Sequence, residues 1–242
     1  MKTPARALKI ILMENQYLTG EYVDKNPTYH VEDSPWKAAQ VLRMVRKHGL
    51  RPASICEIGC GAGEILRQLQ IQLPKGTQLF GYEISPQAIE LCRSRENDAL
   101  RFLHQDLLAT HDGPFDLLLC MDVFEHVSDY LGFLRQLRSK AGLKLFHIPL
   151  DISVLSVLRT TPITGSRASA GHLHYFTKET ALLTLQDAGY EVLDWYYTPG
   201  AIARGKGLRT RLAKRPRQLL SLVNPDWAAR LLGGFSILAL TK

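Results

Sequence analysis

Cysteine is scarce in this sequence of 242 residues, and no two cysteines are paired in a short motif. The four that occur are Cys56, Cys60, Cys92 and Cys120. Because no Cys-x-x-Cys spacing is present, neither a disulfide framework nor a cysteine-based zinc site is indicated. We therefore expect the protein to work in a reducing compartment.

Long hydrophobic runs are also missing. The apolar run at 10–13 is too short for the core of a signal peptide. No later run approaches the roughly 20 apolar residues that a membrane-spanning helix needs. These absences predict a cytoplasmic protein, with contact at the periphery of a membrane as the remaining route to a bilayer.

Acidic residues are absent from 204–217, and this basic segment accounts for the net charge of +7. Its basic side chains are Arg204, Lys206, Arg209, Arg211, Lys214, Arg215 and Arg217. Leu208 and Leu212 share a helical face there, before Pro216, which we expect to interrupt the helix. A basic amphipathic stretch is typical of contact with an anionic membrane surface or an anionic acceptor. RNA is less favoured because the segment lacks aromatic residues for stacking, and a plain solvated surface remains an alternative.

Glycine, in contrast, is concentrated at one point. Gly59, Gly61 and Gly63 follow an apolar run that ends with the acid Glu57. The pattern predicts a buried strand, a tight turn and the start of a helix, whose bare N–H groups suit a bound ligand. A dinucleotide-binding loop fits poorly because Glu64 stands where that motif needs a third small residue. Glu57 instead favours a ligand that carries a cationic group.

Strand and helix patterns alternate through the rest of the chain, which predicts an α/β fold with a doubly wound, mostly parallel sheet. Ligands of such sheets bind beyond the carboxyl ends of the strands. Glu83 ends the second predicted strand about 20 residues after the glycines, where nucleotide-binding units carry a carboxylate for ribose hydroxyls. Asp106 closes the third strand. Ahead of the glycine loop, the tyrosine-rich segment 17–35 reads as irregular structure that covers a site, and Ser34 is expected to cap the helix that follows it.

Together these motifs resemble those of class I S-adenosylmethionine-dependent methyltransferases. The resemblance covers roughly residues 54–149 and rests on the glycine loop, the acid Glu83, the sequence Gln-Asp-Leu at 105–107 and the sequence Asp-Val-Phe-Glu-His-Val at 122–127. A later passage, at 171–177 and 189–190, is similar to the small-molecule branch that includes quinone-biosynthesis methyltransferases. The resemblance implies S-adenosylmethionine as cofactor and a Rossmann-like sheet with an antiparallel C-terminal strand.

The same resemblance assigns roles to single residues. The glycine loop would hold the methionine part of the cofactor, Glu83 the ribose hydroxyls and Asp106 the adenine. The full cofactor-binding set that it implies is Glu57, Gly59, Gly61, Gly63, Glu83, Ile84, Asp106, Leu107, Met121, Asp122 and His126. It divides the chain into an N-terminal helical or irregular cap at 1–53 and a methyltransferase domain at 54–242, with the basic insertion at about 198–232.

On the acceptor side, His30, His174 and Tyr175 are the candidate catalytic residues, with Tyr29 beside them as a base or positioner. His147 reads as a structural histidine held by hydrogen bonds. No metal site is expected, because the histidines at 147, 172 and 174 form no close ligand pair on a helix and no carboxylate is evident beside them.

The expected acceptor is a small or lipid-linked molecule. An Asn/Asp-Pro-Pro-aromatic motif, expected of enzymes that methylate amino groups of nucleic acids, is replaced by Met-Asp-Val-Phe at 121–124. Two alternatives stay open. One is a catalytically silent cofactor-binding or scaffold protein, and the other is an RNA or protein methyltransferase that uses the basic segment.

Overall fold

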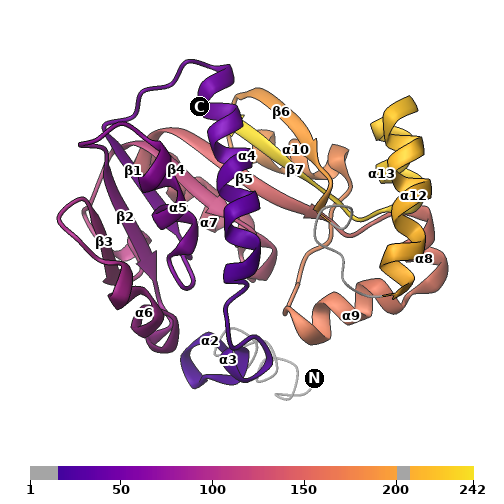
Figure 1. Cartoon of the computed structure of the whole chain (residues 1–242), viewed down its shortest axis with the longest axis horizontal. Helices are drawn as coiled ribbons and strands as arrows, with labels where there is room; N and C mark the ends of the chain where they lie inside the picture. The colour runs from indigo at the N-terminus through magenta and orange to yellow at the C-terminus, as the bar shows by residue number, and fades with distance from the viewer. Residues whose placement is uncertain (1–15, 201–207) are drawn as a thin grey trace, which may run out of the picture.

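The computed structural model describes residues 16–200 and 208–242. A seven-stranded sheet in the order β3-β2-β1-β4-β5-β7-β6 runs through the molecule (Figure 1). The strands are β1 (Ser54–Ile58), β2 (Gln78–Glu83), β3 (Leu100–His104), β4 (Phe115–Met121), β5 (Ala141–Leu150), β6 (Val192–Thr198) and β7 (Phe235–Thr241). The first five are mutually parallel, and β7 runs antiparallel to both of its neighbours. The predicted doubly wound sheet with a reversed C-terminal strand is confirmed.

Helices cover both faces of the sheet, which explains why its strands read as continuous apolar runs. Along β4, Leu117 and Leu119 face one hydrophobic core while Leu118 and Cys120 face the other. The first core contains α4 and α5, and the second contains α7, α10 and α13. The helices of this layered core are α4 (Ser34–Lys47), α5 (Glu64–Gln72), α6 (Pro86–Cys92), α7 (Tyr130–Leu137) and α10 (Lys178–Asp187), with short 3-10 turns η2 (Arg93–Arg95), η3 (Leu107–Ala109), η4 (Phe124–His126) and η5 (Arg138–Lys140).

Two further pairs of helices lie beside the sheet, on the right of Figure 1. They are α8 (Val154–Arg159) and α9 (Thr161–Ser169) after β5, and α12 (Leu208–Val223) and α13 (Pro225–Leu232) between β6 and β7. The insertion expected at about 198–232 is thus largely helical. Pro216 lies inside α12, so the expected interruption there is wrong. Arg204 and Lys206 of the basic segment lie outside the described residues, as do the side chains of Arg209 and Arg211.

The tyrosine-rich segment is more ordered than its composition suggested. It forms α2 (Gln16–Thr19), α3 (Glu21–Lys25) and η1 (Val31–Asp33). The rings of Tyr17 and Tyr22 lie 4.7 Å apart, and those of Tyr22 and Tyr29 lie 5.2 Å apart. Aromatic packing of this kind outweighs the local turn signals of the segment. Asp33, not Ser34, occupies the N-cap of α4, because the 3-10 turn η1 runs directly into the helix.

Gly63 shows why the loop after β1 needs glycine. It occupies the N-cap of α5 with φ of +74°, in the left-handed region. A Cβ atom at this position would lie 2.4 Å from the ring of Phe102 on β3. The glycine therefore allows both the turn and the close packing of α5 against the sheet.

We expect Gly63→Ala to lower the free energy of unfolding by about 2–4 kcal/mol, because it adds overpacking to the cost of a left-handed backbone. Urea unfolding measures this. Gly49→Ala is the matched control, since Gly49 has a similar φ of +59° and its Cβ would meet no described atom within 4 Å. The control should lose only about 1–2 kcal/mol, and equal losses in both variants would show that contact with Phe102 costs nothing.

Candidate functional site

A cavity of about 550 Å³ opens where the five parallel strands end. Because the strand order is β3-β2-β1-β4-β5, the residues that follow these strands line the cavity in the same sequence. Among the described residues, every member of the expected cofactor set lines this cavity except Gly63. Gly63 instead packs close to Phe102. The switch in winding direction lies between β1 and β4, next to the glycine loop.

The carboxylate of Glu83 ties this loop to the end of β2. One of its oxygens accepts the Gly61 N–H at 2.9 Å, and the other accepts the N–H groups of Ile84 and Ser85, each at 2.9 Å. Burial raises the pKa of Glu83, while these N–H donors oppose the rise. A carboxylate has about four lone-pair sites, so Glu83 retains acceptor capacity toward the cavity for hydroxyl groups of a ligand.

Glu57 is a buried carboxylate for which the described residues supply too few partners. Only 1% of it is exposed, and its Oε2 atom has no hydrogen-bond partner in the described part of the chain. Burial raises the pKa of Glu57 to about 8, although nearby Lys37 opposes the rise. An orphaned buried carboxyl in a ligand cavity fits a ligand that brings a cationic group, as the sequence predicted.

Beyond β2 and β3, the cavity wall suits a flat ring with polar edges. Both Ile84, which is exposed, and Leu107, which is buried, line the cavity, and Asp106 is exposed at the start of η3. Oδ1 of Asp106 accepts the Leu108 N–H at 2.9 Å, which orients the carboxylate and leaves its other oxygen for a ligand. The arrangement is consistent with the adenine position that the sequence analysis assigned here.

After β4, Asp122 lies at the centre of a polar chain that the sequence analysis only partly anticipated. Asp122 has φ of +59° and accepts from Lys37 Nζ at 2.6 Å and from His147 Nδ1. The other nitrogen of His147 lies 2.9 Å from Thr198 Oγ1. Although burial acts to raise it, the pKa of Asp122 is held well below its usual range by His147 and Lys37. His147 is therefore confirmed as a structural histidine held by hydrogen bonds.

Lys37 was missed by sequence reasoning. The one feature of the sequence that could have indicated a buried lysine is the position of Lys37 in the amphipathic helix 34–47, close to Ser34 and Ala38, which are buried. Because lysine ordinarily sits on the solvated face of a helix, its direction into the cavity became visible only in the tertiary structure.

The candidate acceptor residues are only partly brought together. Tyr29 and His30 line the cavity, and the Tyr29 hydroxyl lies 2.8 Å from Ser85 Oγ. His174 and Tyr175 lie outside the lining among the described residues. His174 Nε2 is 2.9 Å from the Val127 carbonyl, and the Tyr175 hydroxyl donates to the His172 carbonyl.

Through these contacts, His174 and Tyr175 support their own loop, and their role toward an acceptor stays a prediction. Within the described residues, Ala170 and His172 of this loop line the cavity, and His172 brings a polar side chain to it. Glu125 and His126, from η4, line the cavity near it. Burial and the neighbouring His172 lower the pKa of His126 to about 4, so its ring is neutral at pH 7.

Comparison with known proteins agrees with this geometry. Residues 33–194 match the family model described as "Methyltransferase domain". The ubiquinone biosynthesis O-methyltransferase of Xanthomonas campestris pv. campestris (strain B100) is 30% identical over 153 residues, which cover 57% of this chain and 59% of that protein. The chain thus matches less than two thirds of the length of this curated relative.

Solved structures share the fold at low sequence identity. Magnesium protoporphyrin IX methyltransferase from Synechocystis PCC 6803, solved with bound SAH, superposes with a TM-score of 0.61 at 15% identity, covering 96% of this chain and 97% of that one. The cyclopropane synthase MmaA2 from Mycobacterium tuberculosis gives a TM-score of 0.55 at 16% identity, covering 84% and 83%. At such identities the likeness concerns the fold alone.

Proposed function

The chain belongs to the methyltransferase-domain family, whose cofactor is S-adenosylmethionine, and we propose that it transfers the methyl group to a hydroxyl of a small or lipid-linked molecule. Three observations support the proposal. They are the order of polar groups along the cavity, the size of the cavity, and the O-methyltransferase name of the curated relative.

The order of polar groups is the observation that carries the proposal. Asp106 follows β3, Glu83 is the last residue of β2 and Glu57 lies near the end of β1. Neighbouring strands lie about 4.8 Å apart, so these three carboxylates span roughly 10 Å across the strand ends. This order suits adenine, ribose and a cationic amine in turn. The part of the cavity beyond β4 and β5 then remains for the acceptor.

When bound, S-adenosylmethionine would supply a methyl group on a positively charged sulfur for transfer to an acceptor oxygen. The chain contributes position: Glu83 orients the ribose, Glu57 holds the amine, and the aromatic segment with Tyr29 covers the loop. Such alignment in a cavity sheltered from water accounts for much of the catalysis in reactions of this kind. His30 lines the same cavity and is the candidate base for the acceptor proton.

The acceptor class follows from the cavity. About 550 Å³ lies within the range of cavities that hold a cofactor or another small molecule. The curated relative acts, by its name, in ubiquinone biosynthesis, so a phenolic or quinone-like acceptor is the first candidate. The rivals are an RNA or protein acceptor and a silent cofactor-binding protein.

The first prediction concerns the donor site. At pH 7 Glu57 is mostly protonated when its pKa is about 8, and a cationic amine bound beside it lowers that pKa. Binding of S-adenosylhomocysteine should therefore release more than about half a proton. Titration calorimetry in two buffers with different heats of ionisation measures the release.

Glu57→Gln should bind more weakly and release no proton, and Glu83→Ala should also bind more weakly because it loses a ribose partner and the anchor of Gly61. The matched control is Glu90→Gln, because the Glu90 side chain is 70% exposed on α6. A flat titration with well-folded wild-type protein would refute the donor site. Tight binding without proton release would refute only the role of Glu57.

A second prediction concerns the acceptor. Incubation of the protein with methyl-labelled donor and separated cell fractions should label material that an organic solvent extracts, and Glu83→Ala should lower that label strongly. Label confined to RNA or protein would overturn the small-molecule assignment. Donor binding without label in any fraction would favour the silent cofactor-binding protein.

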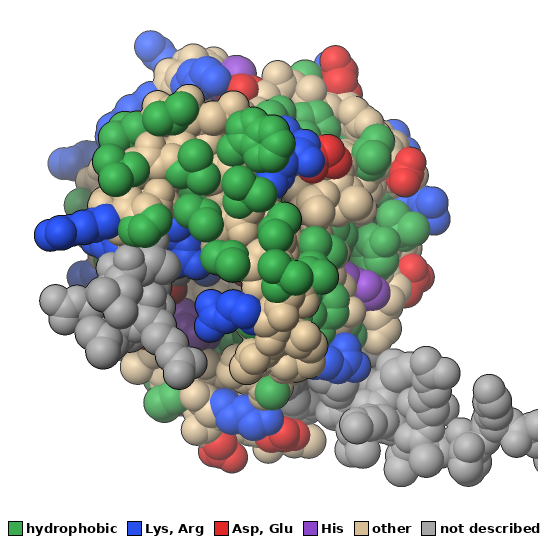
Figure 2. Space-filling model, turned by 90° about the vertical axis from the view of Figure 1, so that its right-hand side faces the viewer, with side chains coloured by type: hydrophobic (Ala, Val, Ile, Leu, Met, Phe, Trp, Pro, Cys, Tyr) green, Lys and Arg blue, Asp and Glu red, His purple; other side chains and the backbone are tan. Residues whose placement is uncertain are grey.

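A third element of the proposal is contact with an anionic membrane surface. Exposed apolar side chains gather on α8, α12 and α13, which pack together, and Figure 2 shows them mixed with Lys and Arg side chains on this face. They include Val157, Leu158, Leu219, Leu222, Val223 and Trp227. Lys214 and Arg215 lie on the same helix, α12, whereas Arg217 donates to the Leu232 carbonyl. In the described part of the chain no helix is long and apolar enough to cross a bilayer.

Mixed apolar and basic side chains suit the interface of an anionic bilayer, where each basic residue contributes about 1 kcal/mol. The protein should sediment with phosphatidylglycerol vesicles but not with phosphatidylcholine vesicles, and Trp227 emission should shift to shorter wavelength. Salt should weaken the binding.

Leu222→Ser with Val223→Ser should reduce sedimentation, as should Lys214→Ser with Arg215→Ser. The matched control is Ile71→Ser with Leu183→Ser, because these two apolar side chains are 66% and 54% exposed on α5 and α10. The control pair should sediment like the wild type. If Leu222→Ser with Val223→Ser also sediments like the wild type, the face is ordinary surface.

A further inference from the structure

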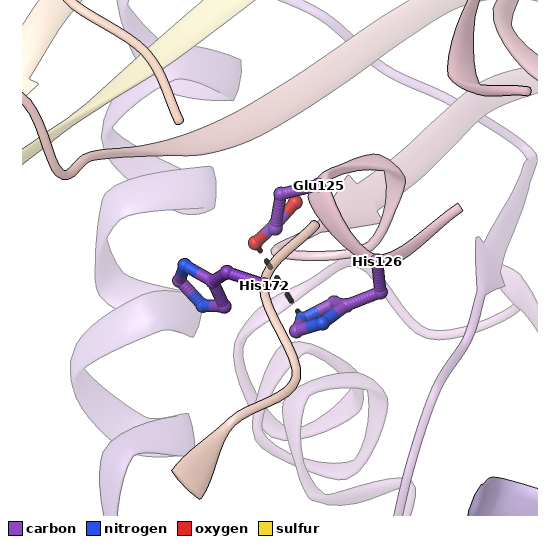
Figure 3. Close-up of side chains that lie close together, drawn as sticks. All are labelled: Glu125, His126 and His172. Atoms are coloured by element: carbon purple, nitrogen blue, oxygen red, sulfur yellow. Dashed lines mark ion pairs between the residues drawn. The ribbon is translucent and has the colours of Figure 1, made fainter. Parts of the chain in front are cut away.

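Three potential metal ligands meet in the part of the cavity beyond β4 and β5. Glu125 and His126 come from the η4 turn, and His172 comes from the loop after α9 (Figure 3). Their ligand atoms all lie within 4.8 Å of one another, and His126 Nε2 is 3.8 Å from Glu125 Oε1. The two imidazole rings meet edge to face with centroids 4.9 Å apart.

Backbone hydrogen bonds bring the two segments together. The Glu125 carbonyl accepts the N–H groups of Leu173 and His174, at 2.8 and 3.1 Å. The His174 side chain adds its contact with the Val127 carbonyl. The loop is thereby held against η4, and His172 is placed next to His126.

The carboxylate of Glu125 needs a partner that the described residues do not provide. Glu125 is fully buried, and neither of its oxygens has a hydrogen-bond partner in the described part of the chain. The same is true of His126 Nδ1. A buried carboxylate and a buried ring nitrogen with free lone pairs are costly unless a cation or donor joins them.

His172 is oriented as metal-binding histidines commonly are. Its Nδ1 lies 2.7 Å from Asp151 Oδ2, so the N–H on that side donates to a carboxylate. This hydrogen bond fixes the tautomer and leaves the Nε2 lone pair for the cluster. A carboxylate behind a ligating histidine typically sets the orientation of the ring and raises its basicity.

We propose that Glu125, His126 and His172 bind a divalent metal ion of the zinc class. Two histidines and one glutamate with an open fourth position are a known ligand set for catalytic zinc. Ligands around tetrahedral zinc lie about 3.4 Å apart, from bond lengths of about 2.1 Å. The three side chains thus need to converge by little more than an ångström.

No metal site was expected from the sequence, because no carboxylate is evident beside the histidines at 147, 172 and 174. Glu125 is that carboxylate, and it was hidden inside the Asp-Val-Phe-Glu-His-Val motif. Its partner His172 lies almost 50 residues further along the chain, so only the loop's attachment to η4 joins them.

The place of the site gives the ion a role, and this step rests on the proposed function. The cluster lies where the strand order leaves room for the acceptor. A hydroxyl that takes the fourth position loses its proton more easily, because the ion stabilises the oxygen anion. The anion then attacks the methyl carbon, the carbon–sulfur bond breaks with its electron pair returning to sulfur, and the acceptor proton passes to solvent or to a base in the cavity.

The test begins with binding and does not depend on methyl transfer. Full-length protein freed of metal by a chelator is titrated with Zn²⁺ by calorimetry, and with Co²⁺ by visible absorption, which reports ligand geometry directly. We expect one ion per chain. Glu125→Gln and His172→Ala should weaken binding by at least about 100-fold, and Asp151→Asn by about 10–100-fold. His111→Ala is the control, because His111 is an exposed histidine outside the cavity lining among the described residues.

Every outcome bears on the proposal. If the well-folded wild type binds neither ion at micromolar concentration, or if Glu125→Gln binds as tightly as the wild type, the site is wrong. Glu125→Gln should keep or raise the melting temperature of the metal-free protein, since it removes an unpartnered carboxylate; a large drop would mean that the carboxylate is already satisfied.

Function is then separated from binding. If metal removal does not affect methyl transfer, the ion site can still exist, but its role in acceptor activation is refuted. If the protein binds one ion but transfers a methyl group to no acceptor, the metal site is supported and the proposed methyl transfer is refuted. S-adenosylhomocysteine binding, measured with and without Zn²⁺, shows that the donor half of the cavity is intact in each variant.

Discussion

The carboxylate of Glu83 is the contact on which the cavity depends. By accepting N–H groups from the glycine loop and from the residues that follow β2, it joins the ends of two neighbouring strands into one wall. The glycine at position 61 reaches it only because the loop bends through left-handed conformations. One buried carboxylate thus holds the loop in place, and in the proposed cofactor site its remaining lone pairs would also accept hydrogen bonds from the ligand.

Carboxylates also dominate the electrostatics of the cavity. Glu57, Glu83, Asp122 and Glu125 all line it. In the described part of the chain Lys37 and His147 are joined to Asp122, whereas Glu57 and Glu125 retain unpartnered oxygens. A low-dielectric cavity with unbalanced carboxylates attracts cations. The amine and sulfonium of the proposed donor at one end, and the proposed divalent ion at the other, would each offset part of this imbalance.

The parts of the chain outside the parallel sheet determine access to this cavity. The tyrosine-rich segment lies over the glycine loop, with Tyr29 in contact with Ser85 and close to Gly61. On another side, α8, α12 and α13 form a face with exposed apolar side chains. The proposed membrane contact would use this face.

The sequence by itself determined the sheet, the glycine loop and the acids at the strand ends, because these features arise from local patterns: apolar runs, turn residues and their spacing. Glu57, Glu83 and Asp106 could be placed because parallel strands bring their carboxyl ends to one edge whatever the loops do. The tertiary structure alone decided which face of α4 turns Lys37 inward, and that His172 rather than His174 reaches the cavity. It also decided that Glu125 meets His172, since that meeting depends on hydrogen bonds between segments almost 50 residues apart, which leave no periodic trace in the chain.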